Sequence, residues 1–244
     1  MTAALEVMAV SKRFGRTAAL EGVTVAVETG SAVALLGPNG AGKTTFMRVC
    51  ATLMRPTSGA VRIFGLDAAN DGRQVRRRIG LLAHESFLYS DLTPTENLLF
   101  YARLFRITQP EAQVRGLIER QGLHGWAHRP LRTLSRGLVQ RCALARVLLH
   151  EPDLIFFDEP FTGLDLEAAT SLAEIIREAR ERGTTIVMST HDLAHAVALC
   201  SSAIVLVAGR VAWSGAVAVD DPAALEARYR ALVGDDSAML AAAS

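Results

Sequence analysis

The sequence predicts an α/β fold that combines a parallel sheet, a small antiparallel β subdomain and an inserted helical subdomain. Three observations predict it. Short apolar runs of strand length alternate with segments of helical periodicity, which is typical of a parallel sheet covered by helices. One of these runs leads through a glycine-rich loop into a helix. The span from about residue 92 to 150 has strong helical signals and no strand signal.

The length and composition set the domain organisation. A chain of 244 residues, half of them hydrophobic, can form one large core with a smaller subdomain. We expect a single domain over residues 1–220, with the helical subdomain at about 92–150 inserted in it. Residues 221–244 should form a C-terminal helix and tail.

Charge, cysteine usage and hydropathy argue against a nucleic-acid-binding protein, a disulfide-bonded secreted protein and a membrane-spanning chain. The net charge is only +1, with 26 basic and 25 acidic residues, so no basic field points to nucleic acid. Cys50, Cys142 and Cys200 lie far apart in apolar helical contexts, which predicts buried thiols in a reducing compartment. No signal peptide and no apolar run of about 18 residues is seen, so we expect a soluble, cytoplasmic chain that reaches a membrane only through a partner.

The first elements predict a small antiparallel sheet. Residues 5–10 and 23–27 have strand patterns, and residues 11–16 between them indicate a turn with an exposed aromatic residue, Phe14. The Phe14 ring is a candidate for stacking on an adenine, with ordinary packing as the alternative.

A phosphate-binding loop follows the apolar run 32–36 and precedes a predicted helix over 44–54. It fits the pattern G-x-x-x-x-G-K-[ST] in the required context of strand, loop and helix. Glycines allow a tight turn whose N–H groups hold phosphates, the lysine reaches the same oxygens, and the first threonine hydroxyl can bind Mg²⁺. The alternative is a glycine-rich turn that matches by chance. The residues are Gly37, Pro38, Asn39, Gly40, Ala41, Gly42, Lys43, Thr44 and Thr45.

The middle of the chain continues the sheet and then becomes helical. We predict strands at 61–64 and 79–83, with the arginine-rich run 73–78 as a solvated helix end. His84 and Glu85 follow the second strand, at the end where open α/β sheets bind ligands. Helices are then expected at 95–105, 110–121 and 135–150, the first of them starting at a Thr-Pro-Thr signal.

The last third supplies two further polar strand ends. Asp158 and Glu159 follow a buried strand at 154–157, and beside a phosphate loop they suggest a magnesium ligand and a residue that polarises the attacking water. A surface acidic pair is the alternative. A helix at 166–182 and a strand at 185–189 follow, and His191 comes directly after that strand. Residues 203–207 and 210–213 predict a hairpin.

Together these motifs resemble the ATP-binding subunit of an ABC transporter, over about residues 4 to 215. Phe14 matches the adenine-stacking aromatic, residues 37–45 the phosphate loop, and 134–141 the family signature. Residues 154–159 match the second nucleotide motif, 163–165 the dimer-contact loop, and His191 the switch histidine. The resemblance implies a P-loop ABC ATPase core, that is, a RecA-like sheet with a small antiparallel β subdomain and an inserted helical subdomain.

The signature and the strand end at 84 depart from the family pattern. Ser135 and Gly137, which touch phosphate in the family, are retained, but Arg136 stands where glycine is usual and Leu138 where glutamine is usual. His84 stands where the family has a glutamine that contacts Mg²⁺ and the attacking water, and Glu85 is its neighbour. We expect ATP binding to survive with altered contacts around the loop.

Three short segments resemble the haem exporter of cytochrome c maturation in particular. They are residues 82–93, the Ser-Arg-Gly signature and residues 210–215. An ABC exporter of another cargo, such as a drug, lipid or polysaccharide, is the alternative, because cargo is chosen in the membrane subunits. The chain has no Cys-x-x-Cys-His site, so no direct haem binding is expected.

The resemblance implies a mechanism, partners and a location. The cofactors are ATP and Mg²⁺, and two chains form a dimer, with Lys43 of one and Ser135 of the other around each ATP. Asp158 and Thr44 hold Mg²⁺, Glu159 orients water, and His191 steadies the γ-phosphate. Integral membrane permease subunits contact the segment from His84 to about Phe105, at the cytoplasmic face of the membrane. A soluble repair or translation ATPase and a small-molecule kinase fit the motifs less well.

Overall fold

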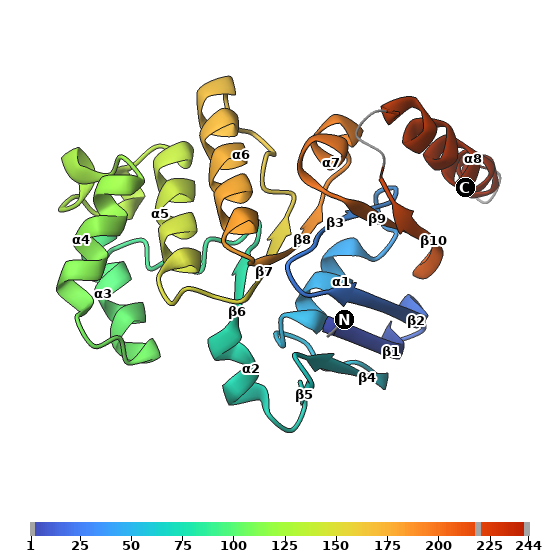
Figure 1. Cartoon of the computed structure of the whole chain (residues 1–244), viewed down its shortest axis with the longest axis horizontal. Helices are drawn as coiled ribbons and strands as arrows, with labels where there is room; N and C mark the ends of the chain where they lie inside the picture. Colours follow the sequence, from blue (N-terminus) through green and yellow to red (C-terminus); the bar gives the residue numbers. More distant parts are fainter. Residues whose placement is uncertain (1–2, 218–220, 242–244) are drawn as a thin grey trace.

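The larger of two sheets forms the centre of the protein. The computed structural model describes residues 3–217 and 221–241 (Figure 1). Six strands lie in the order β10-β9-β3-β8-β7-β6. All neighbouring pairs are parallel except the β9–β10 hairpin at one edge. The strands are β3 (Ala32–Leu36), β6 (Ile79–Leu82), β7 (Leu154–Asp158), β8 (Thr185–Ser189), β9 (Ser202–Val207) and β10 (Arg210–Ala216).

The smaller sheet is antiparallel, in the order β2-β1-β4-β5. It corrects one prediction, since residues 11–14 continue the first strand instead of forming a turn. Lys12 pairs with Leu20 and Arg13 with Ala18, and bulges along β1 break the alternation that marks a strand. The chain therefore reverses only at residues 15–16. The strands are β1 (Ala3–Phe14), β2 (Thr17–Glu28), β4 (Ser58–Ile63) and β5 (Leu66–Asp67).

Helices cover both faces of the larger sheet. On one face, α1 (Lys43–Cys50) packs between the two sheets, where Phe46 and Met47 are fully buried. The opposite face is covered by α5 (Arg136–Leu148), α6 (Leu166–Glu181) and α7 (Leu193–Leu199). Because both faces are covered, strands such as β3 are apolar at every position, and burial leaves only their ends for chemistry.

The helical subdomain lies at one side of the molecule (Figure 1). It contains α3 (Pro94–Phe105), α4 (Pro110–Arg120), two short 3₁₀ turns and α5, all between β6 and β7. Thr93 and Glu96 form a capping box that starts α3 as the Thr-Pro-Thr signal predicts. These helices share their own apolar core. The predicted fold class, an α/β core with an antiparallel subdomain and a helical insertion, is confirmed.

The remaining elements differ from the predictions in detail. Helix α1 ends at Cys50 rather than residue 54, because Thr52 takes a left-handed conformation with φ of 60°. Helix α7 was not predicted. Helix α2 (Gly72–Arg78) contains the arginine run, and α8 (Pro222–Ala241) follows the core; the last residues of the predicted tail, 242–244, lie outside the described residues.

Two further predictions can be checked on the described residues. All three cysteines are buried and unpaired, as predicted. Within residues 3–217 and 221–241, no helix combines the length and the apolar character that crossing a bilayer requires.

Candidate nucleotide-binding site

The carboxyl ends of four parallel strands bring the predicted site residues to one edge of the larger sheet. In the order of the sheet, β3 ends at the phosphate loop, β8 at Thr190 and His191, β7 at Asp158 and Glu159, and β6 at His84. The strands run in register, with Asp158 opposite Ser189 and Leu35 opposite Ser189. Residues as far apart in sequence as Gly37 and His191 therefore meet at one edge (Figure 1).

The backbone of the phosphate loop requires glycine. Gly40 and Gly42 have φ of 82° and 100°, and Gly37 has φ of 149°. A Cβ atom on Gly42 would lie 2.4 Å from the carbonyl oxygen of Ala19, and one on Gly37 would lie 2.2 Å from that of Leu206. The loop thus packs tightly against β2 and β9 before α1 begins.

Lys43 is the first residue of α1 and folds back over the loop. Its side chain is nearly buried, with 8% exposed, and its Nζ donates to the carbonyl oxygens of Gly37 at 2.7 Å and Pro38 at 3.1 Å. Burial lowers the pKa of the Lys43 ammonium, and the negative charges of Glu159 and Asp158 partly oppose this shift. The ammonium therefore lies where an anion would offset the cost of its burial.

Asp158 and Thr44 form a pair of oxygen ligands. The Thr44 hydroxyl lies 3.4 Å from Oδ1 of Asp158, and the same Oδ1 accepts from the Ser189 hydroxyl at 2.7 Å. Hard divalent cations such as Mg²⁺ prefer oxygen ligands, so these two residues fit that ion when phosphate oxygens and water complete its shell. No group of three or more His, Cys, Asp or Glu suited to a metal occurs in the described part of the chain.

Ser189 is a site residue that the sequence reading missed. It is fully buried at the end of β8, donates to Asp158, and accepts the backbone N–H of Glu159 at 2.9 Å. It thus holds both acidic residues from the neighbouring strand. Its signal in the sequence was a polar residue that ends a run of buried apolar ones, beside the polar residues Thr190 and His191.

Glu159 and His191 meet across the ends of β7 and β8. Nδ1 of His191 lies 2.8 Å from Oε2 of Glu159. Glu159 has a left-handed backbone with φ of 52°, a strained conformation for a non-glycine residue that turns its side chain out of the strand. Its side chain is 28% exposed and that of His191 is 68% exposed, so the pair borders solvent.

The structure distinguishes between His84 and Glu85. His84 lines a cavity of about 90 Å³ together with Asp158, Glu159 and Arg136. Glu85 instead approaches Arg48 of α1, with 3.8 Å between the charged atoms. Of the two neighbours, His84 is the one beside the acidic pair.

The signature residues lie at the start of α5. Ser135 caps the helix by accepting from the N–H of Leu138, and the space where Gly137 would carry a Cβ is open. Arg136 packs over Gly163, where an added Cβ would lie 3.0 Å from its guanidinium. Among the described residues no hydrogen bond joins Ser135 or Gly137 to residues 37–45.

Phe14 lies at the tip of the β1–β2 hairpin. Its side chain is 49% exposed, and the ammonium of Lys12 lies 5.3 Å from the ring centroid. Further along the hairpin, Ala19 contacts the phosphate loop at Gly42. The exposed ring is thus attached to a strand that borders the loop.

Comparison with known proteins agrees with this arrangement. The family model described as "ABC transporter" matches residues 20–162. The ATP-binding protein NatA of Bacillus subtilis is 37% identical over 202 residues, which cover 82% of each chain. The daunorubicin resistance ATP-binding protein DrrA3 of Streptomyces coeruleorubidus is 37% identical over 214 residues, 87% of this chain and 68% of that one.

A solved structure is similar over most of the chain. The dimeric, post-hydrolysis structure of the ATP-binding cassette MJ0796 bound to ADP and Pi superposes with a TM-score of 0.80 and 26% identity, over 88% of this chain and 99% of that one. The chain is an ATPase of the nucleotide-binding class that couples ATP hydrolysis to transport. It belongs to the ABC transporter family, as an ATP-binding subunit.

Proposed function

We propose that the chain is the ATP-hydrolysing subunit of an ABC exporter, and that residues 1–220 form its catalytic domain. One observation carries the proposal: Lys43, Thr44, Asp158, Glu159 and His191 converge at one edge of the sheet. Each has the chemistry needed for one task in phosphoryl transfer.

Binding is assigned to the loop and to the hairpin beside it. The N–H groups of residues 37–45 and the Lys43 ammonium hold the phosphates, and Phe14 stacks on the adenine. Thr44 and Asp158 hold Mg²⁺, which neutralises charge on the phosphate oxygens when it is bound. Ser189 keeps the Asp158 carboxylate in place through their 2.7 Å hydrogen bond.

Hydrolysis is assigned to Glu159 and His191. The Glu159 carboxylate orients the attacking water and accepts its proton, because its position at the strand end projects it beyond Asp158. His191 donates a hydrogen bond to that carboxylate and lies close enough to steady the γ-phosphate. His84 completes the wall of the site and hydrogen-bonds water there.

A second copy of the chain completes each site. Ser135 and Gly137 begin a 13-residue helix and make no hydrogen bond to their own phosphate loop in the described structure. Such a helix start binds an anion, and two identical chains related by a twofold axis would each present it to the other's loop. The similarity to a dimeric cassette bound to ADP and Pi supports this arrangement.

A permease contact is proposed on the outer side of α3. A mainly apolar recess of about 420 Å³ lies there, bordered by Leu92, Leu99, Phe100 and Leu104 with Glu96 and Arg103. Tyr89 is exposed and its ring packs edge-on against that of Phe100. An apolar recess on a helix suits a short helix of a membrane subunit. Binding of that subunit would hold the chain at the cytoplasmic face of the membrane.

For the cargo, two proposals remain. Residues 82–93, the Ser-Arg-Gly signature and residues 210–215 favour haem export for cytochrome c maturation. DrrA3, a daunorubicin resistance protein by name, is similar over 87% of the chain and favours a drug-like cargo. We prefer the second, because the similarity extends over far more of the chain than three short segments do.

The test of hydrolysis is ATPase activity of the purified chain, with Glu159→Gln beside it and light-scattering sizing in ATP. We expect Glu159→Gln to lose activity by about 100-fold or more and to accumulate as an ATP-bound dimer. The control Glu181→Gln replaces an exposed glutamate of α6 and should behave as wild type. Wild-type activity in Glu159→Gln would refute the catalytic assignment.

The test of the cargo is deletion of the gene in its own host. Loss of haem-stained c-type cytochromes, restored by the wild-type gene and not by Glu159→Gln, would establish haem export. Unchanged cytochromes with increased sensitivity to daunorubicin would establish export of a drug-like cargo.

A further inference from the structure

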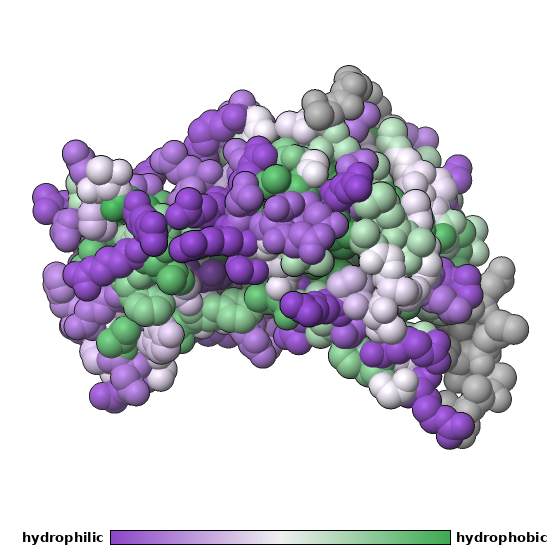
Figure 2. All heavy atoms as spheres, turned by 90° about the horizontal axis from the view of Figure 1, so that it is seen from below, coloured by the Kyte–Doolittle hydropathy of each residue, from purple (hydrophilic) through white to green (hydrophobic). Residues whose placement is uncertain are grey.

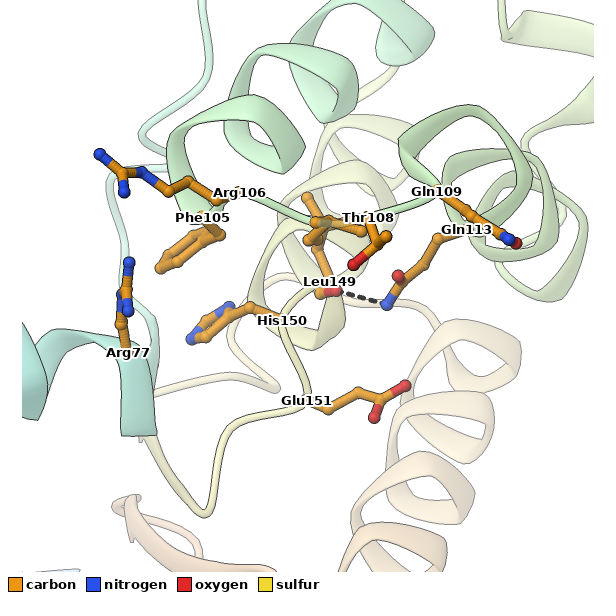
Figure 3. A pocket seen from close by; sticks show the side chains of 10 residues that line it. Arg77, Phe105, Arg106, Thr108, Gln109, Gln113, Leu149, His150 and Glu151 are labelled. Carbon is orange, nitrogen blue, oxygen red and sulfur yellow. Dashed lines mark hydrogen bonds between the residues drawn. The ribbon is translucent and has the colours of Figure 1, made fainter.

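A basic hollow of about 810 Å³ lies between α2, the loop from α3 to α4 and the end of α5 (Figure 3). Arg77 enters it from α2, Arg106 from the loop, and His150 from the end of α5. It is separate from the nucleotide site, whose residues do not line it. The proposed function assigns it no role.

The floor of the hollow is held in place by stacking and hydrogen bonds. The rings of Phe105 and His150 are parallel within 4°, with centroids 3.9 Å apart. Nε2 of His150 donates to the carbonyl of Ile79 at 2.8 Å, and Nε2 of Gln113 donates to that of Leu149 at 2.7 Å. Burial lowers the pKa of His150, so the ring is neutral near pH 7 and the arginines supply the charge.

Two unpaired guanidinium groups occupy one end of the hollow. Arg106 follows the last residue of α3 and has a left-handed backbone conformation with φ of 59°. Its backbone N–H donates to carbonyl oxygens of α3, and the chain leaves the helix at this residue. Arg77 precedes Arg78, the arginine of α2 that pairs with Asp153. Neither Arg77 nor Arg106 has an ion pair among the described residues.

Figure 3 shows how the charges are arranged. The guanidinium groups of Arg77 and Arg106 both reach past the Phe105 ring on the same side. Glu151, the acidic residue of the lining, lies at the other end with its carboxylate pointing away from them. The end that holds Arg77 and Arg106 is therefore positively charged and open to an anion.

The surface of α2 beside the hollow is basic. Arg73 and Arg76 are exposed on α2, the helix that carries Arg77. Seen from the side of α2, hydrophobic surface lies next to hydrophilic surface over the helical insertion (Figure 2). Clustered arginines are attracted to the negatively charged surface of an anionic membrane.

We propose that the hollow binds the phosphate headgroup of an anionic membrane lipid. The planar guanidinium groups of Arg77 and Arg106 would each donate paired hydrogen bonds to its oxygens. A headgroup fits better than an acidic helix, because the two groups converge at one end of a hollow instead of lining a groove. Lipid binding does not depend on ATP hydrolysis, so its failure would leave the proposed function intact.

The experiment is co-sedimentation of the full chain with phosphatidylcholine vesicles and with vesicles of phosphatidylcholine and phosphatidylglycerol. The test variant is Arg77→Gln/Arg106→Gln. The matched control, Arg115→Gln/Arg177→Gln, removes two exposed arginines of α4 and α6 and changes the net charge equally. Thermal melts and ATPase activity show that both variants are folded.

We expect binding to the anionic vesicles only, with a partition coefficient about 30-fold lower in the test variant and little changed in the control. Equal binding to both vesicle types, no binding at low salt, or an equal loss in both variants would overturn the proposal. A further arm of the experiment adds inorganic phosphate or glycerol 3-phosphate to the wild-type chain and the anionic vesicles. Displacement of the chain from vesicles by millimolar amounts of either would identify a soluble phosphate compound as the ligand instead of a lipid.

Discussion

Nδ1 of His191 lies 2.8 Å from Oε2 of Glu159, so the end of β8 positions the end of β7. Ser189, two residues before His191, hydrogen-bonds Asp158 in the same way. Each of the two acidic residues at the end of β7 thus has its own partner at the end of β8. Residues at the end of β8 therefore orient both the Asp158 and the Glu159 carboxylate. The ends of β7 and β8 act together as one site for this reason.

Replacement of His191 should separate catalysis from binding. In His191→Ala the Glu159 carboxylate loses its hydrogen-bond donor, and we expect kcat to fall about 10- to 100-fold with the KM for ATP little changed. Steady-state kinetics measure both. His191→Asn should recover part of the rate, and His124→Ala, at an exposed histidine of the helical subdomain, should match wild type. An unchanged kcat in His191→Ala would show that the contact has no catalytic role.

Ser189→Ala should affect the magnesium requirement. It leaves Oδ1 of Asp158 with only the 3.4 Å contact to Thr44 and the N–H of Glu159 with a longer bond to the Ser189 carbonyl. We expect about tenfold lower kcat, a higher Mg²⁺ concentration for half-maximal rate, and about 1–3 kcal/mol lower free energy of unfolding. Ser202→Ala on β9 is the control. A stability loss with normal activity and normal Mg²⁺ dependence would make Ser189 merely structural.

Much of the fold could be predicted because the signals are local. Short apolar runs identified β3, β7 and β8, and the last two of these strands end in a polar residue. Helix α7 was missed because its seven residues are held by packing and by the Asp192 side chain, which caps two of its N–H groups. The end of β1 was missed because its bulges disrupt the period of two.

Most residues of the candidate site could be predicted from the sequence, but Ser189 could not. The phosphate loop was predicted from a motif with a fixed spacing. Asp158, Glu159 and His191 were predicted because each follows a predicted buried strand. Ser189 was missed because its role depends on the register that places it opposite Asp158. Register between strands 31 residues apart is set by tertiary packing and is not visible in either strand alone.

Burial of Lys43 predicts a pH-dependent stability. Its pKa is lowered in the folded chain, whereas in the unfolded chain it keeps the ordinary value of 10.5. Between these values the unfolded chain binds more protons, so the free energy of unfolding rises with pH, by about 1.4 kcal/mol for each unit of lowering. Denaturant melts at several pH values below 10.5 should show this rise in wild type relative to Lys43→Met. Parallel curves for the two proteins would contradict it.

A mixture of two inactive variants should test the shared site. Lys43→Met removes the loop ammonium, and Ser135→Glu places a negative charge where the signature would meet phosphate. In a mixed dimer with sites between chains, one site has both defects and the other has neither. We therefore expect each variant alone to retain little bound ATP and the equimolar mixture to retain about one ATP per mixed dimer, measured by filter binding after sizing. Mixtures of Lys43→Met with a Lys43→Met/Ser135→Glu double variant contain no intact site and serve as the control. If the first mixture binds no more ATP than the control, the loop and the signature do not act across two chains.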